Sequence, residues 1–150
     1  MFAPGENYKT EQPSVSPSFA PTATLFQTIT SIIKENGVTP DEGFTNTANA
    51  QYLAAEFLAE TDTYVSDNQL MENHSKLIQR YILTVFYFST GGDDWERCSR
   101  FDAGCHGGES SYLSDTSECD WKGIVCDSNN TVIKLEYMSK FVNKFFLLTC

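Results

Sequence analysis

Five cysteines are the residues of this 150-residue chain that are best suited to covalent or metal chemistry. Four of them form two pairs with the same C-x6-C spacing, Cys98 with Cys105 and Cys119 with Cys126. Structural zinc sites usually pair their ligands at C-x2-4-C spacing, so this spacing suits a single metal ion poorly. Short loops in glycine-rich surroundings are typical of extracellular modules stapled by disulfides. The spacing therefore favours two local disulfides.

A zinc site is the alternative use of these cysteines. His106 directly follows Cys105 and would add an imidazole ligand to the four thiolates. On this interpretation the chain is a small zinc-binding regulatory module. Cys150, the fifth cysteine, belongs to neither pair. We favour the disulfides and expect no bound metal and no cofactor.

Carboxylates near the first cysteine pair suggest a weaker alternative, the acidic site of a hydrolase. Asp93, Asp94 and Asp102 would have to surround a pocket, and no spacing in the sequence predicts that they do. The seven acidic residues from Asp41 to Glu72 lack the spacing of a calcium loop and are expected on a solvated face. No phosphate-binding loop, zinc-protease motif or nucleophile elbow occurs. We therefore expect no catalytic residue and no enzymatic activity.

The charge balance restricts the kinds of partner. The chain has 10 basic and 20 acidic residues, so its formal net charge is -10. A clustered basic face is needed to bind nucleic acid or an anionic membrane, and we expect neither partner. The longest apolar stretch, residues 81–88, is shorter than the roughly 20 residues that span a bilayer. The first residues also lack the apolar core of a secretory signal peptide.

Composition divides the chain into four regions. Residues 1–21 are rich in Pro, Ser and Thr and predict a disordered linker. Residues 22–92 have helical periodicity, and residues 93–137 hold four cysteines and both tryptophans. Residues 138–150 form an atypical apolar tail. The expected fold class is α+β, with a helical lead-in, a disulfide-stapled segment and a short β-hairpin.

Two helices are expected before residue 61. The first covers residues 22–36, where apolar residues recur at helical spacing, Thr22 or Thr24 caps the start and Gly37 ends it. The second covers residues 49–60 and is supported by its alanines. Its apolar stripe consists of Leu53, Phe57 and Leu58.

A third helix is expected over residues 67–89. Asp67 is its predicted N-cap, and Thr90-Gly91-Gly92 ends it. A buried strand is the competing interpretation of its apolar end, but the length favours a helix. The apolar residues expected on its buried face are Leu70, Leu77, Ile78, Tyr81, Ile82, Val85 and Phe86.

The second cysteine pair encloses residues suited to a small, tight core. Trp121 supplies a large apolar surface, Gly123 permits a tight backbone and Ile124 points into the same cluster. Two β-prone runs, residues 123–126 and 132–137, flank the turn-forming residues 127–130. These runs predict a β-hairpin directly after the tryptophan.

The run Cys119-Asp-Trp-Lys-Gly-Ile-Val-Cys126 resembles the N-terminal cap of plant-type leucine-rich repeat proteins. The apolar helix before it and the turn Gly92-Asp-Asp-Trp95 resemble the corresponding elements in plant and algal proteins of this kind. The resemblance covers residues 49–137. It implies a disulfide between Cys119 and Cys126 and a tryptophan that packs under the first repeat. The cap core that it implies consists of Trp95, Trp121, Gly123 and Ile124.

The resemblance extends into the first strand of a repeat and then stops. Val132, Leu135 and Tyr137 match the V-x-x-L-x-L pattern of that strand, which would leave Lys134 and Glu136 on the concave side. The asparagine that normally follows is replaced by Lys140, and no complete repeat is present. We therefore expect a truncated or mis-bounded piece of a longer leucine-rich repeat protein.

The function implied by this resemblance is a non-enzymatic one. Such a cap covers the exposed end of a repeat array, so the expected partners are the protein's own downstream repeats and an unidentified protein or peptide ligand. Full-length proteins of this type serve in recognition, some as receptors, which implies an extracellular or membrane-anchored ectodomain. Asn73 and Asn129 begin glycosylation sequons that would be used on that route.

Overall fold

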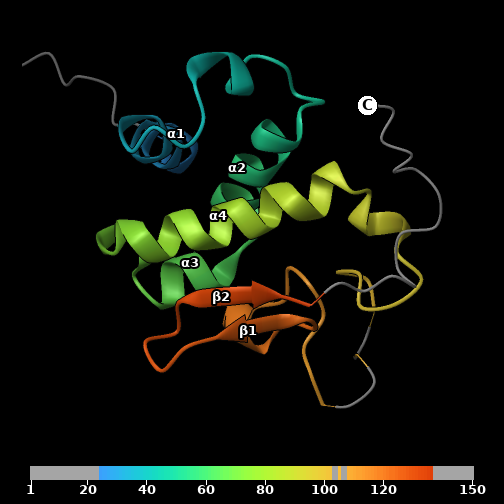
Figure 1. The fold of residues 1–150 in the computed structure, drawn as a ribbon. Coiled ribbons are helices and arrows are strands. Elements are labelled where there is room, and N and C mark those ends of the chain that lie inside the picture. The colour runs from blue at the N-terminus through green and yellow to red at the C-terminus, as the bar shows by residue number, and fades with distance from the viewer. Residues whose placement is uncertain (1–23, 103–104, 106–107, 137–150) are drawn as a thin grey trace, which may run out of the picture.

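A computed structural model of the chain describes residues 24–102, 105 and 108–136 (Figure 1). These residues form the helices α1 (Leu25–Glu35), α2 (Ala50–Glu60), α3 (Thr63–Asp67) and α4 (His74–Ser89). Short 3-10 turns occupy Asp41–Phe44, Leu70–Glu72, Gly92–Asp94 and Glu118–Asp120. The strands β1 (Ile124–Cys126) and β2 (Val132–Leu135) pair antiparallel. The described chain is therefore mostly helical and ends in a two-stranded hairpin.

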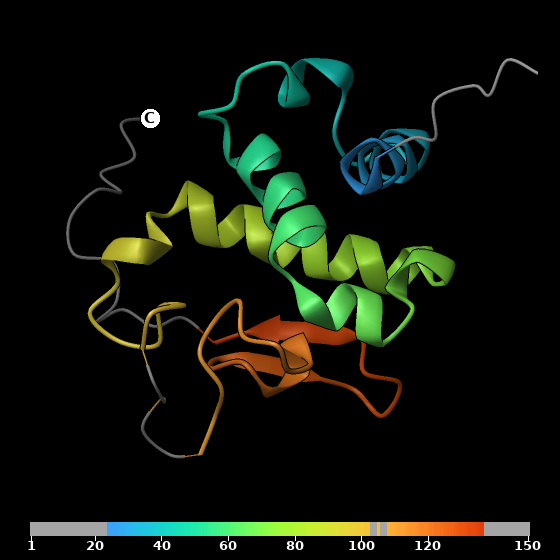
Figure 2. The same ribbon diagram turned by 180° about the vertical axis from the view of Figure 1, so that it is seen from behind.

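Helix α4 lies between helices α1 and α2 on one side and the hairpin on the other (Figures 1 and 2). The short helix α3 and the irregular segment before the hairpin lie on the same side of α4 as the hairpin. Buried side chains from both sides join one apolar cluster that extends along the chain from Ile29 to Ile124. The predicted boundary at residue 92 therefore does not separate two hydrophobic cores.

The first two helices form where the sequence predicts them. Thr24 caps α1 through a reciprocal capping box with Gln27, and Gly37 ends the turn after it in the left-handed conformation, at a φ of 69°. Thr22, the other predicted cap, lies outside the described residues. Helix α2 begins after Asn49 and buries Phe57 and Leu58 with two of its alanines. Leu53 is only half-buried.

The prediction of one helix over residues 67–89 was wrong. Asp67 is the last residue of α3, which starts earlier because the carboxylate of Asp62 accepts a hydrogen bond from the Tyr64 N–H at 3.1 Å. Gln69 then takes a left-handed conformation, which interrupts the helical backbone. The cap of α4 is Asn73, whose side chain accepts a hydrogen bond from the Lys76 N–H at 3.3 Å.

The predicted buried face of this helix was also partly wrong. Leu77 and Tyr81 are buried as expected, but Ile82 and Phe86 are 49% and 36% exposed. The face that packs against the rest of the molecule instead includes Arg80, Leu83, Thr84 and Tyr87. Helix α4 is thus rotated so that a guanidinium and a phenol point inward, and two large apolar side chains remain outside.

The hairpin confirms the predicted strand–turn–strand pattern. The register pairs Ile124 with Leu135 and Cys126 with Val132, and an irregularity between Val125 and Cys126 shifts the pairing. Asp127 organises the turn, because its Oδ1 accepts hydrogen bonds from the N–H groups of residues 129 and 131, both at 2.9 Å. Tyr137, the predicted end of the second strand, lies outside the described residues.

Candidate functional site

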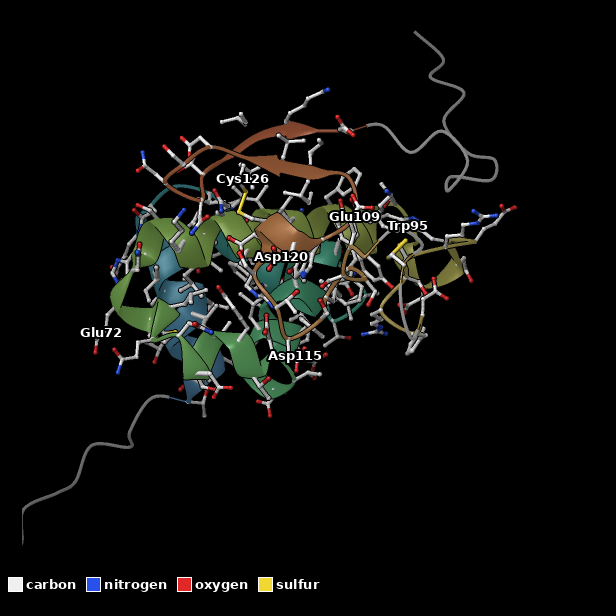
Figure 3. The ribbon with its side chains drawn as sticks, turned by 90° about the horizontal axis from the view of Figure 1, so that it is seen from below. Glu72, Trp95, Glu109, Asp115, Asp120 and Cys126 are labelled. Atoms are coloured by element: carbon white, nitrogen blue, oxygen red, sulfur yellow. A yellow bond between two sulfur atoms is a disulfide. The ribbon has the colours of Figure 1, made fainter. Side chains whose placement is uncertain are left out.

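The candidate site is the outer surface of the hairpin, together with the residues that fix the hairpin on α4. Both predicted disulfides are present: Cys98 is bonded to Cys105 and Cys119 to Cys126, with Cα atoms 5.1 and 5.6 Å apart. Figure 3 shows them as two yellow bonds, one at Cys126 and the other beside Trp95. The second disulfide joins β1 to the 3-10 turn just before it.

Trp121 forms the centre of the stapled segment. Its side chain is 1% exposed and packs against the ring of Tyr112, with centroids 5.3 Å apart. The guanidinium carbon of Arg80 lies 4.7 Å from the centroid of the indole ring, a cation–π distance. Ile124 is also buried beside this cluster. The helical layer of the chain therefore covers the tryptophan that the resemblance assigns to the cap core.

Arg80 is fully buried and connects three separate parts of the chain. Its Nε and Nη2 donate hydrogen bonds to the two carboxylate oxygens of Asp62 at 2.5 and 2.9 Å. Its Nη1 donates to Glu118 Oε2 at 3.3 Å. The carbonyl groups of Ser114 and Thr116 accept two further bonds from this guanidinium, each at 2.9 Å. The side chain thus joins α4 to the cap of α3 and to the turn that carries Glu118.

Sequence reasoning missed this ion cluster. A signal for it does exist, because Arg80 is the only charged residue from position 77 to position 92, in an otherwise neutral and largely apolar stretch. A charge in such a stretch is found buried only when it is paired. The partners could not be identified from the sequence, because Asp62 and Glu118 are 18 and 38 positions away.

Two further side chains of α4 hold the hairpin turn. Gln79 donates from Nε2 to the Asn130 carbonyl at 3.0 Å and accepts from the Val132 N–H at 2.9 Å. Lys76 donates to the carbonyl groups of Asn129 and Asn130 at 2.9 and 2.5 Å. These contacts place the start of β2 against the first half of α4.

A polar hollow of about 180 Å³ lies where α3, the start of α4 and the hairpin turn meet, and its lining includes Tyr64, Lys76 and Glu118. The charged groups of this lining are already bonded, Lys76 to the turn and Glu118 to Arg80. The hollow therefore belongs to the connection between helix and hairpin.

An aromatic cluster closes the other end of α4. Trp95 is buried between Tyr87 and Tyr112, with ring centroids 5.0 and 4.9 Å away. Gly92 is required beside this cluster, because a Cβ atom there would overlap the Tyr87 ring at 2.3 Å. Burial raises the pKa of Tyr112 to about 12, and burial is also the main cause of a raised pKa at Tyr87.

Two residues of the alternative acidic site, Asp93 and Asp102, are engaged in local hydrogen bonds. Asp93 accepts hydrogen bonds from the Tyr87 hydroxyl at 2.8 Å and from Arg100 at 2.7 Å, and Asp102 accepts one from the Ser99 N–H at 3.0 Å. The four cysteines are held in disulfides, and His106 lies outside the described residues. Among the residues that the structure describes, no group of three or more potential ligands could hold a metal ion.

Strand β2 exposes two apolar side chains on one face and an ion pair, alternating with them, on the other. Ile133 and Leu135 are 64% and 46% exposed. Lys134 and Glu136 form an exposed ion pair with each other at 3.0 Å. Within the described part of the chain, β2 pairs only with β1, so its second edge has no strand partner.

The two glycosylation candidates lie in different settings. Asn73 and Asn129 are both exposed. The side chain of Asn73 caps α4, whereas Asn129 lies in the hairpin turn, where its backbone N–H donates to Asp127. Asn129 is therefore the more accessible acceptor of the two.

Comparison with known proteins found no matching family model, no matching curated protein and no matching solved structure. In the described part of the chain, none of the helices combines the length and the apolar content needed to cross a membrane.

Proposed function

We propose that this chain acts as the N-terminal cap of a leucine-rich repeat array and has no catalytic role. The observation that carries the proposal is the state of β2. This strand follows directly from a disulfide-stapled, buried tryptophan cluster, yet Ile133 and Leu135 remain exposed beside an unpaired strand edge. A surface of this kind suits the addition of a further strand with an apolar layer beneath it.

The way in which the rest of the chain fixes the hairpin supports the same role. A cap must cover an apolar array end and must itself end in a closed, polar unit. Trp121 and Arg80 are buried within the chain, and the disulfide between Cys119 and Cys126 fixes β1 to them. The hairpin is thereby fixed to the core of the chain. In the described part of the chain, the second edge of β2 is open to pairing with a further strand.

The partners and location follow from this proposal. The first partner is a run of leucine-rich repeats that continues the sheet from β2, and the complete array then binds a protein or peptide ligand. Two disulfides in a chain of this size are typical of an oxidising compartment, so we propose an extracellular or membrane-anchored ectodomain. Asn129 would be glycosylated there.

A fusion protein tests the capping role. Residues 1–137 are joined in register to consensus leucine-rich repeats that lack their own cap, a boundary that keeps the whole described core, from Ile29 to Ile124. We expect a monomeric fusion whose repeats unfold at a higher urea concentration than the uncapped repeats.

The matched control is the same fusion with Ile133→Thr and Leu135→Thr. Threonine is compatible with a strand, and both side chains are exposed in the free chain, so the hairpin should survive. Only the apolar contact with the first repeat would be lost. Repeats that aggregate or unfold equally with and without residues 1–137 would refute the proposed function.

A further inference from the structure

The outer flank of α4 carries exposed apolar side chains that the core does not use. Six large apolar residues are markedly exposed in the described part of the chain, and four of them lie on only two elements, Ile82 and Phe86 on α4 and Ile133 and Leu135 on β2. The remaining two, Leu25 and Phe101, lie elsewhere. Exposed apolar residues gathered on neighbouring elements mark interaction surfaces, whereas scattered ones are ordinary.

The two elements lie side by side and run in the same direction (Figures 1 and 2). Gln79 bonds to the backbone just before β2, at Asn130, and at its first residue, Val132. Ile82 and Phe86 are three and seven positions after Gln79, so they continue along the same flank of the helix. They therefore border the side of α4 on which β2 is held.

The flank is also electrically neutral, although the molecule carries a net charge of -10. From residue 77 to residue 92 the only charge is that of Arg80, which is buried and paired. Lys134 and Glu136 compensate each other on the strand. A long neutral surface on a strongly acidic protein suits an apolar partner and offers nothing to a charged one.

Phe86 is held in position without being covered. Its ring lies 6.1 Å from that of Trp95, centroid to centroid, yet the residue is 36% exposed. A side chain fixed on one side and open on the other is ready to pack against an incoming surface with little loss of side-chain entropy.

We infer that Ile82 and Phe86 form, together with Ile133 and Leu135, a single surface that packs against the first leucine-rich repeat. This inference rests on the proposed capping function and adds a helical half to the interface. The repeat extends the sheet at β2, and the apolar layer beneath its strand packs on the flank of α4.

The test uses the fusion described above with Ile82→Gln and Phe86→Gln. Glutamine is a good helix former, so α4 should persist. We expect the urea midpoint of the repeats to fall toward that of the uncapped array. This fall should exceed the shift that loss of the Phe86–Trp95 contact causes in the free 150-residue chain, which is measured separately. The matched control is Leu25→Gln with Phe101→Gln, which removes two exposed apolar side chains elsewhere and should leave the fusion unchanged.

The outcomes separate the two proposals. If the helix variant leaves the midpoint unchanged while the Ile133→Thr and Leu135→Thr variant lowers it, the capping function stands and the helical half of the interface is refuted. If residues 1–137 do not stabilise the repeats at all, the capping function itself fails. If sedimentation shows that the free chain is a dimer and the helix variant makes it monomeric, a second copy is the true occupant and the inference is wrong.

A second measurement does not depend on stability. A benzophenone amino acid is placed at position 82 of the fusion, and its cross-links are mapped by mass spectrometry. We expect cross-links to peptides of the first repeat. Cross-links confined to residues 1–137, or formed between two fusion molecules, would overturn the inference.

Discussion

Arg80 illustrates how one residue connects distant parts of this chain. Its guanidinium is bonded to carboxylates from two segments and lies against the rings of Tyr64 and Trp121, 4.5 and 4.7 Å from their centroids. Such a cluster need not make the fold more stable than apolar side chains of the same volume would. We expect it to make the fold specific, because each of its buried charges requires the others as partners.

Removal of the guanidinium should be severely destabilising. Arg80→Ala leaves Asp62 and Glu118 buried without their cation, and breaking a buried ion pair in this way costs about 3–5 kcal/mol. The free energy of unfolding, measured in urea, should fall by this amount. Arg97→Ala, which removes an exposed arginine, is the control and should change it by less than about 0.5 kcal/mol. Equal effects of the two substitutions would contradict the ion cluster.

The raised pKa of Tyr112 predicts that the protein loses stability in alkaline solution. Its folded-state pKa of about 12 exceeds the unfolded value of 10.0, because burial disfavours the phenolate. The folded state therefore binds this proton more tightly, so the stabilisation is complete below pH 10 and is lost as the pH rises from 10 toward 12. Subtracting the alkaline absorbance titration of Tyr112→Phe from that of the unchanged chain should give a step near pH 12. A step near pH 10 would contradict the burial.

At the scale of elements, local caps decide where the helices begin. The helical periodicity correctly predicted α4 over residues 74–89 but not a single helix from residue 67, and the turn residues correctly predicted the hairpin. The exact start of α4 could not be predicted, because Asp62, Asp67 and Asn73 are all residue types that cap helices. The structure uses the first and the third of them. The intervening Asp67 ends α3 instead.

A pair of substitutions tests this assignment. Asn73→Ala removes the side-chain oxygen that accepts from the Lys76 N–H, and the loss of such a cap costs about 1 kcal/mol. Asp67→Ala, at the cap predicted from the sequence, should change stability by less than about 0.5 kcal/mol. Urea unfolding of unglycosylated protein measures both. A larger effect at Asp67 than at Asn73 would restore the longer helix.

The buried face of α4 was harder to predict than its existence. An apolar pattern places Ile82 and Phe86 inside, but a helix in contact with two layers must also satisfy Arg80 and Tyr87. The pairing of Arg80 with Asp62 and Glu118, and of the Tyr87 hydroxyl with Asp93, depends on tertiary contacts. Those contacts rotate the helix, and sequence periodicity does not contain them. The disulfides, in contrast, follow from local spacing.

For the whole molecule, the helical lead-in and the stapled hairpin form one unit. The apolar cluster extends across both, and α4 contributes buried side chains to it and also holds the hairpin turn. The helices therefore serve as the support on which the hairpin is presented. This arrangement explains how a strand of only four residues, Val132–Leu135, can be held with two of its apolar side chains exposed.

The central claim is that β2 accepts a further strand from a leucine-rich repeat. The Glu136 N–H donates to the Gly123 carbonyl at 2.7 Å, so the neighbouring Leu135 N–H points away from β1. Hydrogen exchange at Leu135 therefore reports directly on the free edge. We predict that this amide exchanges rapidly in the free chain and becomes strongly protected when residues 1–137 are fused to the repeats. Equally rapid exchange at Leu135 in the free chain and in the fusion would contradict the account.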